Sequence, residues 1–173
     1  MLLACRRGKG FPAGSVMGRQ EAEDLFARAW ENHRKGDVDR AIALYEESIR
    51  VFPTAEAYTF LGWAYSHQGD LDRAIEECRR AIETDPDYGN PYNDIGAYLV
   101  QKGMHEDAIP WLEKAMRAGR YESYHYPHMN LGRVYLHQKN YVKAMAEFEK
   151  ALKFEPAYTL AKVQLAKLRA MFN

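Results

Sequence analysis

Apolar residues recur at the spacing of one face of an α-helix along most of the chain. Leu61, Ala64 and Tyr65 mark one such face, and Ala74, Cys78 and Ala81 mark the next. A helix that is apolar on one side cannot bury that side by itself. The pattern therefore predicts helices that pack on one another in pairs, the second helix of each pair against the first.

The helical pattern occurs four times at a nearly constant interval. Equivalent alanines of the second helices lie 33, 34 and 36 residues apart, at Ala41, Ala74, Ala108 and Ala144. Glycines of three first helices repeat in phase with them, at Gly62, Gly96 and Gly132. Small residues at Gly62 and Ala74 fit a place where two helix axes approach closely. A repeat of this length with two helices per unit predicts a stacked array.

Short turns separate the two helices of each unit. Gly36, Gly69 and Gly103 each follow a first helix, where a left-handed residue satisfies its last carbonyls. In the fourth unit Lys139-Asn140 replaces the glycine, and we expect the asparagine to take this conformation. The carboxylates after two of the turns are predicted caps, and prolines end three second helices. These residues are Asp37, Asp70, Pro53, Pro86 and Pro156.

The repeated unit resembles the tetratricopeptide repeat. The resemblance is carried by Leu61-Gly62 followed by Tyr65, by the spacing of Ala74 and Ala81, and by the closing Pro86. The resemblance covers residues 20–156 and implies an all-α, right-handed α-solenoid of four helix-turn-helix repeats. The expected units are 22–54, 55–88, 89–124 and 125–156. The first unit has Ala29 in place of the glycine. The third lacks the proline and has two extra residues within 118–127, which we expect to change the angle to the fourth unit.

The two ends depart from the repeat. Residues 1–19 carry four basic residues and no acid, and we interpret them as a disordered tail. Cys5 follows Leu-Leu-Ala as in a lipoprotein cleavage site, but no charged and apolar leader precedes it, so lipidation is not expected. Residues 157–173 form a predicted capping helix with one apolar face. That face comprises Ala161, Leu165, Leu168 and Phe172.

Composition limits the classes of function. The 24 basic and 24 acidic residues cancel, which argues against a broad nucleic-acid or membrane surface. The 47% of hydrophobic residues is enough for a core, and no apolar run is long enough to span a membrane. Two cysteines cannot form a disulfide framework, which indicates a reducing compartment, and the resemblance to bacterial repeat proteins makes the cytoplasm the expected location. Weak nucleic-acid binding through the tail and the cap's Lys162, Lys167 and Arg169 is a minor alternative.

The resemblance also implies that the first helices line a concave groove that binds an extended peptide or a helix of a partner protein. The register of the repeats gives the groove-facing candidates Phe26, Trp30, Thr59, Trp63, His67, Asn93, Gln101, Asn130, Arg133 and His137.

The candidates divide into an aromatic end and a polar end. Trp30 and Trp63 hold equivalent places in adjacent units, so we expect them side by side as a contact surface for a partner. The alternative is that they pack on a neighbouring helix or are covered by Phe11 of the tail. At the polar end, the amides of Asn93 and Asn130 suit a peptide backbone, and Arg133 suits a carboxylate. A merely solvated polar face is the alternative there.

Other chemistries are less well supported by the residues. The positions at which related chaperone-binding proteins grip a carboxylate hold Phe26, Trp30, Phe60, Asn90 and Asp94, which supply no cation. His125 and His128 alone do not make a metal site, and we expect neither metal nor cofactor. Cys78 falls on a buried face, where its thiol is expected to be inert. No phosphate loop or catalytic triad pattern is present, so we expect no enzymatic activity.

The sequence thus predicts a non-catalytic adaptor that binds a protein or peptide through its concave face, with no nucleic acid or membrane as partner. The alternative is a self-associating subunit, a homo-dimer for example, that uses the capping helix and the tail. Leu160, Val163 and Met171, on a second side of that helix, favour the alternative.

Overall fold

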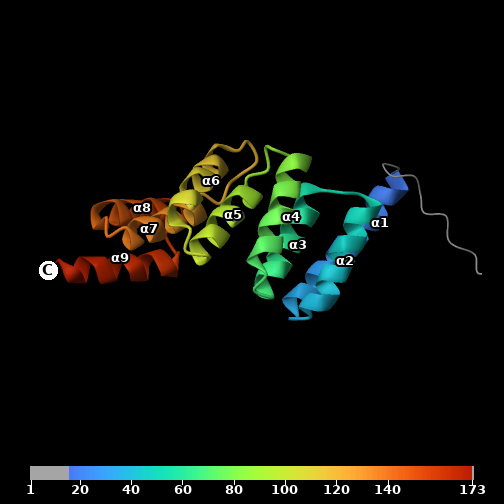
Figure 1. Ribbon diagram of the computed structural model, residues 1–173, viewed down its shortest axis with the longest axis horizontal. Coiled ribbons are helices and arrows are strands. Elements are labelled where there is room, and N and C mark those ends of the chain that lie inside the picture. Colours follow the sequence, from blue (N-terminus) through green and yellow to red (C-terminus); the bar gives the residue numbers. More distant parts are fainter. Residues whose placement is uncertain (1–15, 173) are drawn as a thin grey trace, which may run out of the picture.

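The computed structural model describes residues 16–172, and within this range the chain forms nine α-helices. They are α1 (Val16–Arg34), α2 (Val38–Val51), α3 (Ala55–His67), α4 (Leu71–Thr84), α5 (Asn90–Gln101), α6 (His105–Arg117), α7 (His125–His137), α8 (Tyr141–Phe154) and α9 (Thr159–Met171). The array is elongated, with α1 and α9 at opposite ends (Figure 1).

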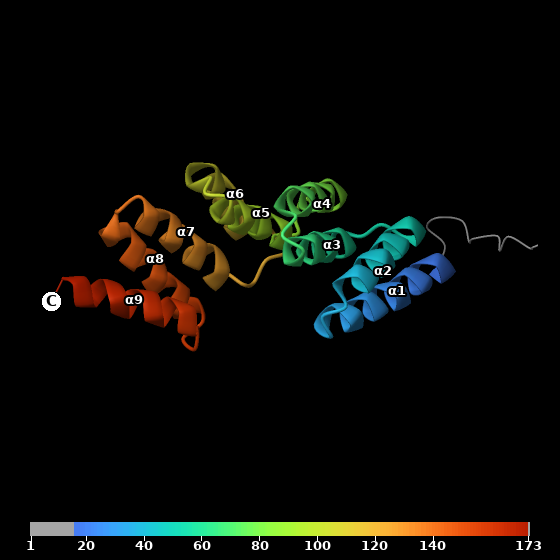
Figure 2. The same ribbon diagram turned by 60° about the horizontal axis from the view of Figure 1, so that its bottom comes forward.

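The helices pack as four consecutive pairs followed by α9. Each odd-numbered helix from α1 to α7 packs on the helix that follows it, and Figure 2 shows these pairs side by side. The second helix of each pair also contacts the first helix of the next, and α8 contacts α9 in the same way. Further contacts join α1 to α3, α3 to α5 and α5 to α7, which places the first helices on the inner side of the array. The fold is the all-α solenoid that the repeats predict.

Glycine takes the left-handed conformation in the first three turns. The φ angles of Gly36, Gly69 and Gly103 are 85°, 82° and 79°. In the fourth turn the left-handed residue is Lys139, with φ 58°, so the expectation for Asn140 was wrong. Lys139 is equivalent to Gly103 in the repeat, whereas the Asn140 side chain accepts a hydrogen bond from the Lys143 backbone N–H at 3.2 Å and caps α8.

The predicted caps and breaks are confirmed. Asp37 and Asp70 accept hydrogen bonds from the backbone N–H groups of Arg40 and Arg73, and α2, α4 and α8 all end two residues before a proline. The close approach at Gly62 is confirmed too: a Cβ there would lie 2.8 Å from the carbonyl oxygen of Ala74. Any larger residue at this position would push α4 away from α3.

Two expectations for the chain ends need correction. The helix α1 begins at Val16, so residues 16–19 are helical and do not belong to a tail. The remaining predicted tail residues lie outside the described range. In α9, Ala161, Leu165 and Leu168 are buried against the fourth unit, but Phe172 is 61% exposed. Phe172 follows the last helical residue, where the chain has left the apolar face.

The longer loop of the third unit packs over the start of α5. The Arg120 backbone N–H donates to the carbonyl of Asp87 at 2.8 Å, and the Gly89 N–H donates to the carbonyl of Arg120 at 3.1 Å. The Tyr121 side chain is buried against Gly89, where an added Cβ would come within 2.4 Å of the Tyr121 Cβ and 2.6 Å of its ring. The change of angle between the third and fourth units stays a prediction.

Candidate binding groove

Four aromatic side chains from α1 and α3 form a continuous wall on the inner side of the array. We call Phe26, Trp30, Phe60 and Trp63 the aromatic cluster. The rings of Trp30 and Trp63 stack with centroids 5.7 Å apart, as their register predicts, and Phe60 meets Trp30 edge-on at 5.3 Å. Trp63 is 38% exposed, an unusual value for a side chain of this size. The cluster therefore presents apolar surface to solvent.

Phe60 was not among the sequence candidates. It stands two residues before Gly62, and the sequence analysis considered it only among the positions at which related proteins grip a carboxylate. Its ring also contacts Phe26 at 5.2 Å, so it connects four aromatic neighbours, which are Phe26, Trp30, Tyr45 and Trp63. The signal was available in the register, because Trp30 of the preceding unit faces the same position.

A buried tyrosine of α2 packs behind the aromatic cluster. Tyr45 of α2 is fully buried, and its ring lies 5.5 Å from that of Phe26. Burial raises the pKa of the Tyr45 hydroxyl, which keeps this group neutral. The cluster therefore rests on packed residues that hold its rings in place.

A histidine pair borders the cluster at the turn end of α1 and α3. Nε2 of His33 and Nδ1 of His67 lie 2.9 Å apart, and both rings contact Trp63. His33 is buried, and burial first, then the nearby His67, lowers its pKa. The distance is that of a hydrogen bond, in which one of the two nitrogens donates and the other accepts.

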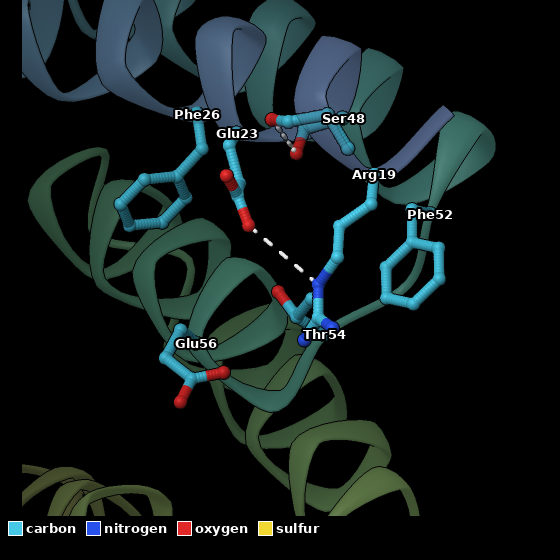
Figure 3. Close-up of a pocket in the computed structure, with 8 residues that line it drawn as sticks. Arg19, Glu23, Phe26, Ser48, Phe52, Thr54 and Glu56 are labelled. Carbon is cyan, nitrogen blue, oxygen red and sulfur yellow. Dashed lines mark hydrogen bonds and ion pairs between the residues drawn. The ribbon is translucent and has the colours of Figure 1, made fainter. Parts of the chain in front are cut away.

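A cavity of about 320 Å³ continues the cluster towards the start of α3 (Figure 3). Arg19 and Glu23 face each other across it, with Nε and Oε1 3.6 Å apart, and the Arg19 guanidinium lies 5.3 Å from the Phe52 ring centroid. Phe26 belongs to both the cavity and the aromatic cluster. The lining residues are Arg19, Ala22, Glu23, Phe26, Ser48, Phe52, Thr54 and Glu56.

Three of the polar candidates, Thr59, Asn93 and Asn130, are buried. The Thr59 hydroxyl donates to the Ala55 carbonyl within α3 at 2.7 Å. The Asn130 side chain donates to Oδ1 of Asn93 at 3.3 Å, and both residues are only 8% exposed. One hydrogen bond thus joins the two amides where α7 packs on α5, and little of either side chain is exposed.

The remaining polar candidates are exposed. Gln101, Arg133 and His137 lie along the inner helices α5 and α7. The ring of His137 stacks on His105 with centroids 3.8 Å apart. Burial and the neighbouring His137 lower the pKa of His105, which favours the neutral form of the His105 ring.

Asp94 is an acidic group that the sequence did not include among its candidates. Its carboxylate is partly buried on α5 and accepts a hydrogen bond from the Asn93 amide at 3.2 Å. Burial raises its pKa to about 7, and the Asn93 hydrogen bond opposes this only in part. Within residues 16–172 Asp94 makes no ion pair.

The described residues contain no cluster of three or more His, Cys, Asp or Glu side chains that could hold a metal ion. Cys78 is fully buried, and burial, followed by the nearby Asp94, raises the pKa of its thiol well above the usual value. A thiol that stays protonated is a poor nucleophile. Over residues 16–172, each helix is too short or too polar to cross a membrane.

Comparison with known proteins agrees with this geometry. Models of the tetratricopeptide repeat match residues 26–89 and 125–158. This chain belongs to the tetratricopeptide repeat family. Tetratricopeptide proteins generally mediate interactions between proteins.

The tetratricopeptide relatives are mostly longer proteins. Small glutamine-rich tetratricopeptide repeat-containing protein 2 of Saccharomyces cerevisiae is 29% identical over 106 residues, which is 61% of this chain and 31% of that protein. This chain spans about a third of the length of the curated relatives that it matches first.

Solved structures share the fold. PilF of Pseudomonas aeruginosa superposes with a TM-score of 0.80 at 25% identity, over 87% of this chain and 69% of that one. YrrB, a tetratricopeptide protein described as having an unusual peptide-binding site, gives a TM-score of 0.67 at 19% identity, over 83% of this chain and 73% of that one.

Proposed function

We propose that this tetratricopeptide protein is a non-catalytic binding module that holds a peptide or helix of a partner protein in the groove along α1, α3, α5 and α7. The aromatic cluster is the apolar anchor of this groove. The observation that carries the proposal is the stacked pair of Trp30 and Trp63, which lies on the inner side of the array with Trp63 38% exposed.

Physical reasoning favours a partner on this surface. Tryptophan is among the residues that contribute most binding energy at protein interfaces, because its ring buries a large area with little loss of side-chain freedom. The cluster is supported by buried Tyr45, so little reorganisation is needed on binding. The fold is compatible with a peptide ligand, since YrrB is described as having a peptide-binding site.

The test compares two variants that each remove tryptophan from a different face. The Trp30→Ala, Trp63→Ala variant removes the stacked pair of the cluster. Trp111→Ala instead alters α6, where Trp111 contacts Arg79 and Lys114. Each protein is immobilised, captured partners are identified from a lysate, and their affinities are measured with purified components.

We expect the double variant to lose partner affinity by at least about tenfold while Trp111→Ala keeps it. Circular dichroism establishes that both variants remain helical. The proposal is wrong if the folded double variant keeps full affinity for every captured partner.

A second candidate function is self-association through α9, favoured by the apolar surface that this helix leaves uncovered. Leu160, Val163 and Met171 are 57%, 43% and 60% exposed. Light scattering over a range of concentrations tests it. Self-association predicts a mass that rises with concentration in the wild type and falls back to the monomer in Val163→Glu; a constant monomer mass in the wild type contradicts it.

A further inference from the structure

Asp94 occupies the place in the third unit that Phe60 occupies in the second. Each residue stands two positions before the glycine of its unit. Phe60 packs on Trp30 and Tyr45 of the preceding unit. By the same register Asp94 stands next to the second unit, where its charge acts on Cys78, the residue equivalent to Tyr45. The aromatic cluster is thus followed along the groove by a carboxylate.

The groups around this carboxylate are neutral. The phenols of Tyr88, Tyr98 and Tyr121 interact with it electrostatically, and for each of them burial is the larger cause of a raised pKa. The hydroxyl of Tyr121 is buried and has no hydrogen-bond partner among the described residues. Buried hydroxyls are normally paired, so this group indicates a polar region whose interactions are incomplete.

The neighbouring cation is already engaged. Arg120 pairs with Glu56 at 2.6 Å and with Asp85, and its guanidinium lies 5.1 Å from the Tyr88 ring centroid. The other acids at this end of the groove have partners as well, since Glu23 pairs with Arg19. Asp94 is therefore the acid of this half of the groove whose charge the described part of the chain leaves uncompensated.

We infer that Asp94 receives a lysine or arginine side chain of the bound segment, while an apolar side chain of the same segment lies on the aromatic cluster. This inference rests on the proposed function. A cation offers the buried carboxylate the charge-assisted hydrogen bonds that the protein does not supply. A segment with an acidic residue at this position is repelled, which gives the groove a preference for basic over acidic partners.

Pairing with a cation also offsets the free energy that ionised Asp94 costs the unbound protein. A carboxylate with a pKa of about 7 is destabilised in its charged form by its surroundings. A bound ammonium or guanidinium group lowers that pKa again, so association is accompanied by proton release near neutral pH.

The experiment starts from a library of random twelve-residue peptides displayed on phage and selected on the wild-type protein. The enriched peptides are synthesised with a fluorescent label, together with copies in which each basic residue is replaced by glutamine. Their affinities are measured by fluorescence anisotropy for four proteins: the wild type, Asp94→Asn, the double variant Trp30→Ala, Trp63→Ala, and the control Glu113→Gln. The control removes a negative charge from an exposed side chain of α6.

We expect the enriched peptides to carry a basic residue near an aromatic or aliphatic one. Replacing that basic residue should weaken binding to the wild type and to Glu113→Gln by about tenfold, and to Asp94→Asn by less than about twofold. The inference is overturned if the enriched peptides lack a basic residue, if no peptide is enriched, or if the loss is the same for Asp94→Asn and the wild type.

The double tryptophan variant separates the two levels of the proposal. Peptides that lose affinity with the tryptophans but show no coupling to Asp94 leave the groove function standing and remove only the basic preference. Peptides that bind the double variant as tightly as the wild type remove both, because they do not use the groove.

Discussion

Nε2 of His33 lies 2.9 Å from Nδ1 of His67, and this contact joins α1 to α3 at the edge of the aromatic cluster. The two residues are 34 positions apart in the sequence, one repeat length. The pair connects two units at the point where Trp63 is exposed, so its protonation state bears directly on the groove.

Acidification should weaken the junction between the first two units. The pKa of His33 is lowered by burial and by His67, so below pH 6.5 the unfolded chain binds a proton more readily than the folded one. The free energy of unfolding therefore falls as the pH drops from 7.5 to 5. Thermal unfolding followed by circular dichroism should show a larger fall in Tm for the wild type than for His33→Gln. Equal falls in the two proteins would show that the pair does not titrate as argued.

Asp94→Asn should stabilise the protein above neutral pH. The folded-state pKa of about 7 lies above the ordinary value of 3.8, so the folded state loses stability as the pH rises from about 4 to 7. We expect the Asp94→Asn substitution to raise the free energy of unfolding by about 1–3 kcal/mol at pH 8. This is less than the full pKa shift corresponds to, because the side chain is partly exposed and solvent screens its charge. Urea unfolding at pH 8 and pH 5 measures the difference.

At pH 5 only the first part of this stability has been lost, because the loss begins near pH 4 and continues to about pH 7, so the gain should be clearly smaller than at pH 8. Glu113→Gln, which changes an exposed acid, should alter stability little at either pH. A gain for Asp94→Asn that is equal at both pH values would contradict the raised pKa.

Lys139→Gly should stabilise the fourth unit by about 0.5–1 kcal/mol. Lys139 holds a left-handed φ of 58°, a conformation that glycine adopts without steric cost and that other residues adopt less readily. The gain is measured by urea unfolding. Gly69→Ala, at the equivalent position of the second unit with φ 82°, should lose stability by a similar amount. A loss of stability in Lys139→Gly would mean that its side chain contributes more than the strain costs.

Tyr121 should stabilise the third unit through its ring and not through its hydroxyl. The residue is 6% exposed, and its hydroxyl has no hydrogen-bond partner in the described part of the chain. We expect Tyr121→Phe to change the free energy of unfolding by less than about 1 kcal/mol, and Tyr121→Ala to lower it by about 3 kcal/mol. Unfolding curves of the two variants decide the matter; a large loss in Tyr121→Phe would reveal a partner for the hydroxyl.

The sequence by itself determined the repeat and therefore the fold. Gly62 opposite Ala74, the capping Asp70 and the closing Pro86 are local requirements of a helix pair, and local requirements can be read from spacing alone. The pairing of Trp30 with Trp63 followed from the same register, since equivalent residues of adjacent units lie side by side.

Only the tertiary structure decided which residues of the inner helices are free to meet a partner. Asn93 and Asn130 have the chemistry of peptide-binding amides, but they are buried where α7 packs on α5 and bind each other. Asp94, adjacent to Asn93 in the sequence, has no ion-pair partner among residues 16–172, whereas Arg120 from the loop after α6 pairs with Glu56 and Asp85. Register places a side chain on a helix face, whereas burial and ion pairing depend on which other helices and loops reach that face, and this is a property of the packed array.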